Sequence, residues 1–81
     1  MKILWTATAL RALEAVPRRP AESILGRLEV AARHPWMYPL RGRGRYRGYR
    51  WFPAGPWLVF YQVVGPALVV RGILHGSRRG A

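Results

Sequence analysis

The stretch that decides the fold is residues 46–79, which read YRGYRWFPAGPWLVFYQVVGPALVVRGILHGSRR. Within it, three runs rich in β-branched and aromatic residues are separated by a Pro-Ala-Gly-Pro segment at 53–56 and a Gly-Pro pair at 65–66. Runs of this composition between turn-forming pairs indicate consecutive strands joined by short turns. We therefore predict an antiparallel meander with strands at 46–52, 57–64 and 67–75.

The second and third of these runs are almost continuously apolar, as in Trp57-Leu58-Val59-Phe60-Tyr61 and Leu68-Val69-Val70. Continuous apolar runs are typical of central strands that are covered on both faces. Few residues remain outside the meander to cover a second face. We therefore expect one face of the sheet to lie under the helices and the other to be only partly covered, so that it is a surface for a protein partner.

The residues before the meander predict a strand and two helices. The apolar run at 2–5 is a short strand, and Thr6 or Thr8 then caps a helix that places Ala9, Leu13 and Val16 on one face. Pro17 ends this helix.

A second helix follows, with Pro20 in its first turn and His34-Pro35 at its end, where a histidine suits the helix C-terminus. Its predicted buried stripe consists of Ile24, Leu25, Leu28, Ala31 and Ala32. The chain is thus predicted to be one α+β domain over residues 1–81: a short N-terminal strand, a helical hairpin and a three-stranded antiparallel meander in one sheet.

The charge balance is strongly basic. Lys and Arg number 14 against 3 Asp plus Glu, a formal net charge of +11 in 81 residues. Such a surplus attracts nucleic acid, ribosomes, an anionic membrane or an acidic protein, and of these we expect no membrane partner. Only Lys2 among the basic residues is not arginine, a bias that suits planar contacts with phosphate or carboxylate, although a GC-rich genome would produce the same bias.

The acidic and sulfur-containing residues exclude several kinds of site. There is no Cys and no Asp, and Glu14, Glu22 and Glu29 all fall on the predicted helices. Disulfides, thiolate metal sites, a Ser-His-Asp triad and carboxylate pairs are therefore not expected. An enzyme with this composition would be a metal-free and cofactor-free one, with ribonuclease as the natural class. We find no signal peptide or membrane span and expect a cytoplasmic protein.

Alternating arginines precede the meander. In a strand they would point to one face and could follow a phosphate backbone, with Tyr46 and Tyr49 available for base stacking. The alternative is a solvated basic loop whose charge prevents edge-to-edge association of sheets. These arginines are Arg41, Arg43, Arg45 and Arg47.

The end of the last predicted strand brings His75 close in sequence to Arg71, Arg78 and Arg79. An imidazole among guanidiniums could carry out acid–base chemistry on a phosphodiester while the arginines stabilise its charge. Alternatively, His75 merely caps the strand.

The order of these features resembles the RelE/ParE superfamily, the toxins of bacterial type II toxin–antitoxin systems. The likeness runs almost from end to end and rests on short motifs in sequence order: Ile3-Leu4-Trp5-Thr6, Pro35, Tyr49-Arg50-x-Phe52-Pro53-x-Gly55, Leu58-Val59-Phe60-Tyr61-Gln62-Val63 and Val70-Arg71-x-Ile73-Leu74-His75-Gly76-x-Arg78. The resemblance implies a cognate acidic antitoxin and a toxin–antitoxin hetero-oligomer.

The resemblance leaves two targets open, because RelE-like members are ribosome-dependent mRNA interferases whereas ParE-like members inhibit DNA gyrase. The nuclease branch typically carries an arginine in the central strand at the position held here by Leu58, and leucine cannot stabilise phosphorane charge. This favours gyrase. The residues expected to face the target are Arg50, Arg71, His75, Arg78 and Arg79. A non-toxic nucleic-acid or ribosome accessory protein is a further alternative.

Overall fold

The computed structural model describes residues 1–76 and confirms the predicted α+β architecture. Arg78 and Arg79 of the predicted target-facing set lie outside the described residues. The elements, in chain order, are β1 (Lys2–Trp5), α1 (Ala7–Glu14), α2 (Arg18–Arg33), β2 (Arg50–Ala54), β3 (Trp57–Val64) and β4 (Ala67–His75).

The four strands form one sheet in the order β1-β4-β3-β2. The meander strands pair antiparallel, and β1 joins the edge of β4 in parallel. Each meander turn consists of a Gly-Pro pair in which the glycine has positive φ, 61° at Gly55 and 57° at Gly65. Because proline has a fixed negative φ, this combination matches the type II′ turn, whose twist suits hairpins. In this strand order β3 and β4 are the two central strands, which are the two runs predicted to be central.

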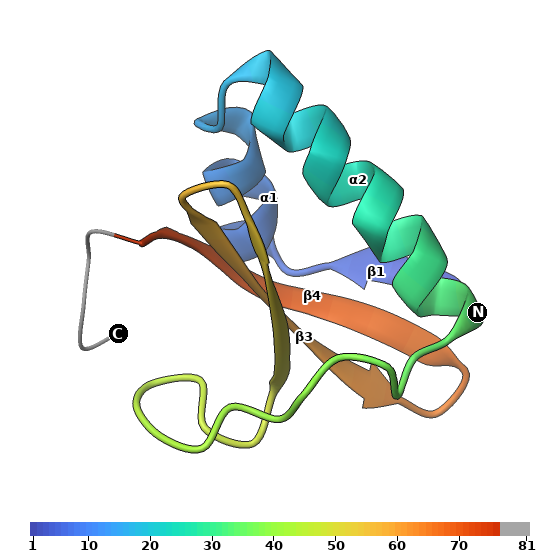
Figure 1. The fold of residues 1–81 in the computed structure, drawn as a ribbon. Coiled ribbons are helices and arrows are strands. Elements are labelled where there is room, and N and C mark those ends of the chain that lie inside the picture. Colours follow the sequence, from blue (N-terminus) through green and yellow to red (C-terminus); the bar gives the residue numbers. More distant parts are fainter. Residues whose placement is uncertain (77–81) are drawn as a thin grey trace.

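Both helices lie on one side of the sheet, which we call the helix face (Figure 1). Thr6 is the N-cap of α1, as predicted, since its hydroxyl accepts a hydrogen bond from the backbone N–H of Ala9 at 3.1 Å. His34 is the C-cap residue of α2. Within the described chain, no helix is both long enough and apolar enough to span a membrane.

The buried stripe of α2 contains four of its five predicted members, Ile24, Leu28, Ala31 and Ala32. Leu25 was wrongly assigned to it and is 43% exposed. A step of one residue rotates the helix by about 100°, which carries Leu25 to the edge of the stripe. This stripe forms one hydrophobic core with residues of the sheet, which include Phe52, Val59, Tyr61 and Val70.

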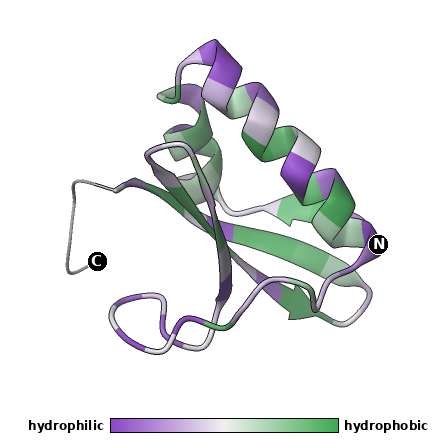
Figure 2. Cartoon of the chain, in the orientation of Figure 1, coloured by the Kyte–Doolittle hydropathy of each residue, from purple (hydrophilic) through white to green (hydrophobic). Residues whose placement is uncertain are grey.

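The first meander strand was predicted to begin at Tyr46, but β2 begins at Arg50. Residues 45–49 form turns instead, and Gly48 has a φ of 86° that no strand residue adopts. The alternating arginines therefore do not share one strand face. They belong to a segment that we call the arginine loop (residues 35–49), along which hydrophilic residues predominate (Figure 2).

The arginine loop wraps around the edge of β2 from the helix face to the opposite face, which we call the outer face. On the helix face the ring of Tyr38 contacts that of Phe52, with centroids 4.7 Å apart. At the edge, Trp51 N–H donates to the Pro39 carbonyl at 3.1 Å. On the outer face Tyr46 buries Phe60, which has no exposed surface. The second face is therefore partly covered, as predicted, and the cover at its centre is the arginine loop.

Candidate functional site

A β-bulge in β4 places Arg71 and Gly72 side by side on the outer face. Phe60 pairs with Gly72 and Tyr61 pairs with Val70, so Arg71 is an extra residue between two paired ones. A bulge places two successive side chains opposite one partner and thereby changes the direction of one of them. Alternation from the core residues Leu68 and Val70 already points Arg71 outward, and the bulge adds Gly72 to the same face and returns Ile73 to the core.

The centre of the outer face is a stack of Tyr46 on Phe60. The two rings are nearly parallel, 9° apart, with centroids separated by 4.2 Å. The Tyr46 ring also extends over Gly72, where any β-carbon would collide with its hydroxyl. Gly72 is therefore required for the arginine loop to lie flat on the sheet, as expected for a glycine at a close approach within a strand.

A first hollow, which we call the Arg71 hollow, opens beside this stack and measures about 310 Å³. The guanidinium of Arg71 lies 5.6 Å from the centre of the Tyr49 ring, and that of Arg45 lies 5.6 Å from the Tyr46 ring. Cations at this distance are attracted to the ring faces. The hollow is lined by Thr6, Thr8, Arg45, Tyr46, Tyr49 and Arg71.

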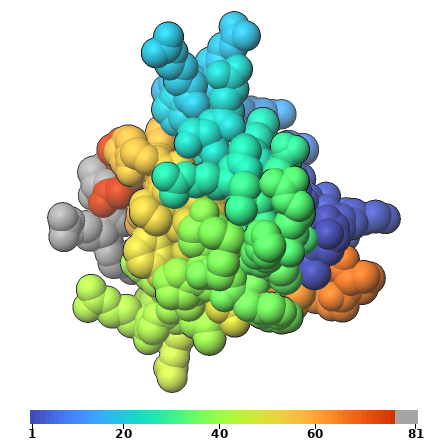
Figure 3. Space-filling model, turned by 45° about the vertical axis from the view of Figure 1, so that its right-hand side comes forward, coloured from blue at the N-terminus to red at the C-terminus, as the bar shows by residue number. Residues whose placement is uncertain are grey.

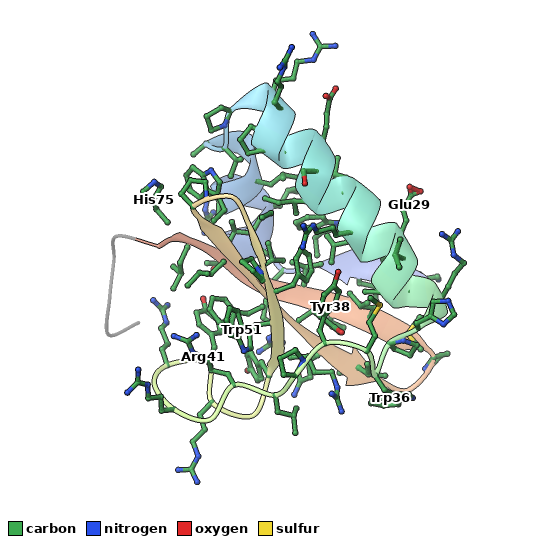
Figure 4. All side chains as sticks on the ribbon, viewed as in Figure 1. Glu29, Trp36, Tyr38, Arg41, Trp51 and His75 are labelled. Carbon is green, nitrogen blue, oxygen red and sulfur yellow. The ribbon has the colours of Figure 1, made fainter. Side chains whose placement is uncertain are left out.

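A second hollow, the Arg41 hollow, measures about 350 Å³ and is lined by Arg41, Gly42, Arg43 and Trp51. The guanidinium of Arg41 lies 5.1 Å from the Trp51 ring and 5.6 Å from that of Phe60. Figure 4 shows Arg41 and Trp51 close together beneath the sheet. The Nε atom of Arg41 is buried and has no hydrogen-bond partner, so its donor capacity is unused.

The remaining predicted site residues do not join these hollows. Arg50 donates a 2.7 Å hydrogen bond to the Tyr38 carbonyl, and its guanidinium lies 5.0 Å from the Trp36 ring. The ring of His75 packs edge-on against that of Trp57, with ring centroids 4.9 Å apart. It lies apart from the Arg41–Trp51 pair (Figure 4). Trp57 belongs to the core-packed side of the sheet. The structure thus separates Arg50, Arg71 and His75 into three places.

Charge on the loop is not balanced by carboxylates. Arg43, Arg45 and Arg47 are exposed, and side chains of this segment project into solvent (Figure 3). Glu14, Glu22 and Glu29, the chain's acidic side chains, all lie on the helices. The one ion pair among residues 1–76 lies on α2, where the Nε of Arg18 is 3.4 Å from a carboxylate oxygen of Glu22. The same residues contain no cluster of side chains that could hold a metal ion.

Tyr61 ties the start of the arginine loop to the core, because its hydroxyl donates a 2.9 Å hydrogen bond to the Pro35 carbonyl. Burial raises the pKa of this phenol above its usual value, and the nearby positive charge of Arg50 opposes that increase. The neutral, donating form of Tyr61 is thus the form that the fold requires.

Sequence reasoning missed Thr8 and Gly72 as members of this surface and missed Trp51 as the wall of a hollow. A glycine inside a strand run is a known signal for a bulge or a close backbone approach, so Arg71-Gly72 was readable as such. The contribution of Thr8 carried no local signal, because it depends on where α1 begins relative to β4.

The fold is similar to those of several solved toxin–antitoxin structures. The RelBE2 complex of Mycobacterium tuberculosis matches with 19% identity over 91% of this chain and 95% of that chain, at a TM-score of 0.76. The intact RelBE complex of E. coli matches with 17% identity over 89% of this chain and 92% of that chain, at a TM-score of 0.72. The RelB–RelE complex of Methanococcus jannaschii matches with 19% identity over 91% of each chain, at 0.68.

At these identities the structural likeness establishes the fold alone, and no curated protein sequence matches the chain. A family model does match, over residues 3–80, and describes the ParE toxin of a type II toxin–antitoxin system, parDE. Since that match covers almost the whole sequence, this chain belongs to the ParE toxin family, within the RelE/ParE superfamily that its sequence motifs resemble.

Proposed function

We propose that this protein arrests bacterial growth by inhibiting DNA gyrase and that a cognate antitoxin neutralises it. The observation that carries the choice of gyrase is Leu58, the residue at the position where the RNA-cleaving branch of the superfamily typically carries an arginine. The match of the chain to the ParE toxin family model also supports gyrase as the target.

Leu58 lies in an apolar cross-strand row. It pairs with Leu74 on β4 and with Pro53 on β2. A developing phosphorane charge needs positively charged or hydrogen-bonding groups aimed at it. This row offers only hydrocarbon, which suits contact with a protein surface.

The position of His75 also favours docking over cleavage. General acid–base catalysis requires the imidazole to come within hydrogen-bond reach of the reacting oxygen while a cation holds the phosphate. His75 is on the core-packed side at the end of β4, against Trp57, whereas Arg71 is turned to the outer face. The two groups would therefore approach different sides of a substrate.

The antitoxin is supported by charge and by exposed apolar side chains. The net charge of +11 favours an acidic partner. On the arginine loop, Trp36, Met37 and Leu40 are 64%, 51% and 57% exposed. Large exposed side chains of this kind commonly mark a protein interface. The three similar structures named above are themselves toxin–antitoxin complexes.

The test is to incubate the purified protein with gyrase, ATP and relaxed plasmid, and in parallel with ribosomes translating a defined message. We expect supercoiling to fall and cleaved plasmid to accumulate, with the message intact. Cuts in the message at the ribosomal A site, lost in a His75→Ala variant, would instead establish the mRNA interferase alternative. If induction in a bacterial host does not slow growth, neither toxin activity is present and a non-toxic accessory role follows.

A further inference from the structure

We infer that the outer face binds the phosphodiester backbone of a nucleic acid, with one phosphate in the Arg71 hollow and another in the Arg41 hollow. This goes beyond the proposed function, whose target is a protein. It does not depend on gyrase, because a toxin acting at any nucleic-acid enzyme could use the same contact.

Each hollow presents a pair of arginines, Arg45 with Arg71 and Arg41 with Arg43. Ring contacts hold three of these guanidiniums over Tyr46, Tyr49 or Trp51. A guanidinium attracted to a ring still has N–H donors that can bind two phosphate oxygens. With the glutamates confined to the helices, a phosphate meets no competing carboxylate there.

The spacing of the hollows fits a chain of phosphates. The Arg41 hollow is built on Trp51 of β2 and the Arg71 hollow on β4, with β3 between them. Two strand spacings are about 10 Å. One short nucleic-acid strand can therefore reach both hollows.

Aromatic walls distinguish a nucleic acid from an acidic peptide as the ligand. Tyr49 and Trp51 are half-buried, so each ring retains accessible surface beside a guanidinium pair. Bases and sugars can pack on such rings, whereas glutamate and aspartate side chains have no flat face to offer. Thr8, which is exposed in the Arg71 hollow, adds a hydroxyl donor for a phosphate oxygen.

The decisive experiment compares two double variants that lose equal charge. Arg45→Gln/Arg71→Gln removes the Arg71 hollow, and Arg19→Gln/Arg33→Gln removes two exposed arginines of α2. Binding of short fluorescein-labelled DNA and RNA strands and duplexes is followed by anisotropy over a salt series, after circular dichroism has shown that each variant is folded.

We expect the hollow variant to bind on the order of tenfold more weakly at low salt, and the slope of log K against log salt to fall by about 1.4 to 1.8, from two lost contacts. The α2 variant should change much less. Equal losses in both variants would mean that the net charge alone attracts nucleic acid, and the inference would be wrong. The order of affinity among the DNA and RNA probes identifies the preferred strand type.

Two further measurements keep the test decisive. If the hollow variant does not fold, an NMR titration of the wild-type protein with inorganic phosphate replaces it: signals of Arg71 and Tyr49 should shift and those of Arg19 should not, and the reverse would refute the site. If polyglutamate binds as tightly as the oligonucleotides and is equally sensitive to Arg45→Gln/Arg71→Gln, the surface belongs to an acidic protein instead. Because no gyrase is present, failure of this inference is separate from failure of the gyrase proposal.

Discussion

The two faces of the sheet are covered by different kinds of side chains. On the helix face, aliphatic and aromatic side chains pack without any buried polar side chain among the described residues. On the outer face, the arginine loop covers Phe60 with a tyrosine ring and brings guanidiniums against aromatic walls. Since exposed arginines add little to stability, we expect the helix face to maintain the fold, and the outer face is the surface that we propose for binding.

The largest expected effect is on the helix face. Leu28→Ala would leave a cavity where a fully buried side chain meets the sheet, and we expect the free energy of unfolding to fall by about 2–5 kcal/mol. Urea denaturation measures this loss. Leu25→Ala on the same helix is the matched control and should cost much less, because Leu25 is 43% exposed. Similar losses for both would show that α2 packs with a different face.

The next effect tests the close approach on the outer face. Gly72→Ala would push a methyl group into the hydroxyl of Tyr46, and we expect a loss of about 1–3 kcal/mol in unfolding free energy. Gly26→Ala serves as the control, since open space surrounds Gly26 in a helix where alanine is preferred. An unchanged stability in the Gly72 variant would mean that the arginine loop does not lie on the sheet.

The hydrogen bond by which Tyr61 holds the start of the arginine loop should depend on pH. The raised pKa of Tyr61 means that the folded protein holds this proton more tightly than the unfolded chain. Its stabilising contribution is therefore complete below the ordinary pKa of 10.0 and is lost as pH rises through the folded-state value.

Tyr61→Phe should lower stability by about 1 kcal/mol at neutral pH, because the Pro35 carbonyl loses its donor. Above pH 10 the variant should lose less stability than the wild type. Thermal unfolding across this range measures both effects. Parallel curves for the two proteins would contradict the assignment to Tyr61.

The smallest expected effect on stability is at Arg41. Replacement by methionine keeps an unbranched side chain over Trp51 and removes the buried, unpartnered Nε, so we expect a change of less than about 1 kcal/mol. Urea denaturation checks this value. A large loss of stability would assign Arg41 to the fold, and the contrast between the two faces would disappear.

Much of the fold was predictable from local signals. The Gly-Pro pairs set both hairpin turns, because a glycine with positive φ followed by proline is tied to one turn geometry. Thr6 marked the start of α1, and the spacing of Ile24, Leu28 and Ala31 marked the buried face of α2. The arginines of the outer face were recognised as target-facing candidates, but not their arrangement.

Turn chemistry, helix capping and apolar periodicity act over a few residues, so the chain alone specified the helices, most of the strands and the α+β class. The separation of His75 from Arg71 and the course of the arginine loop were decided only by tertiary structure. Each depends on register: one extra residue opposite Phe60 puts His75 on the opposite face from Arg71, and the missing β-carbon of Gly72 admits Tyr46 from a distant segment. No pattern within the strand itself encodes that choice of partner.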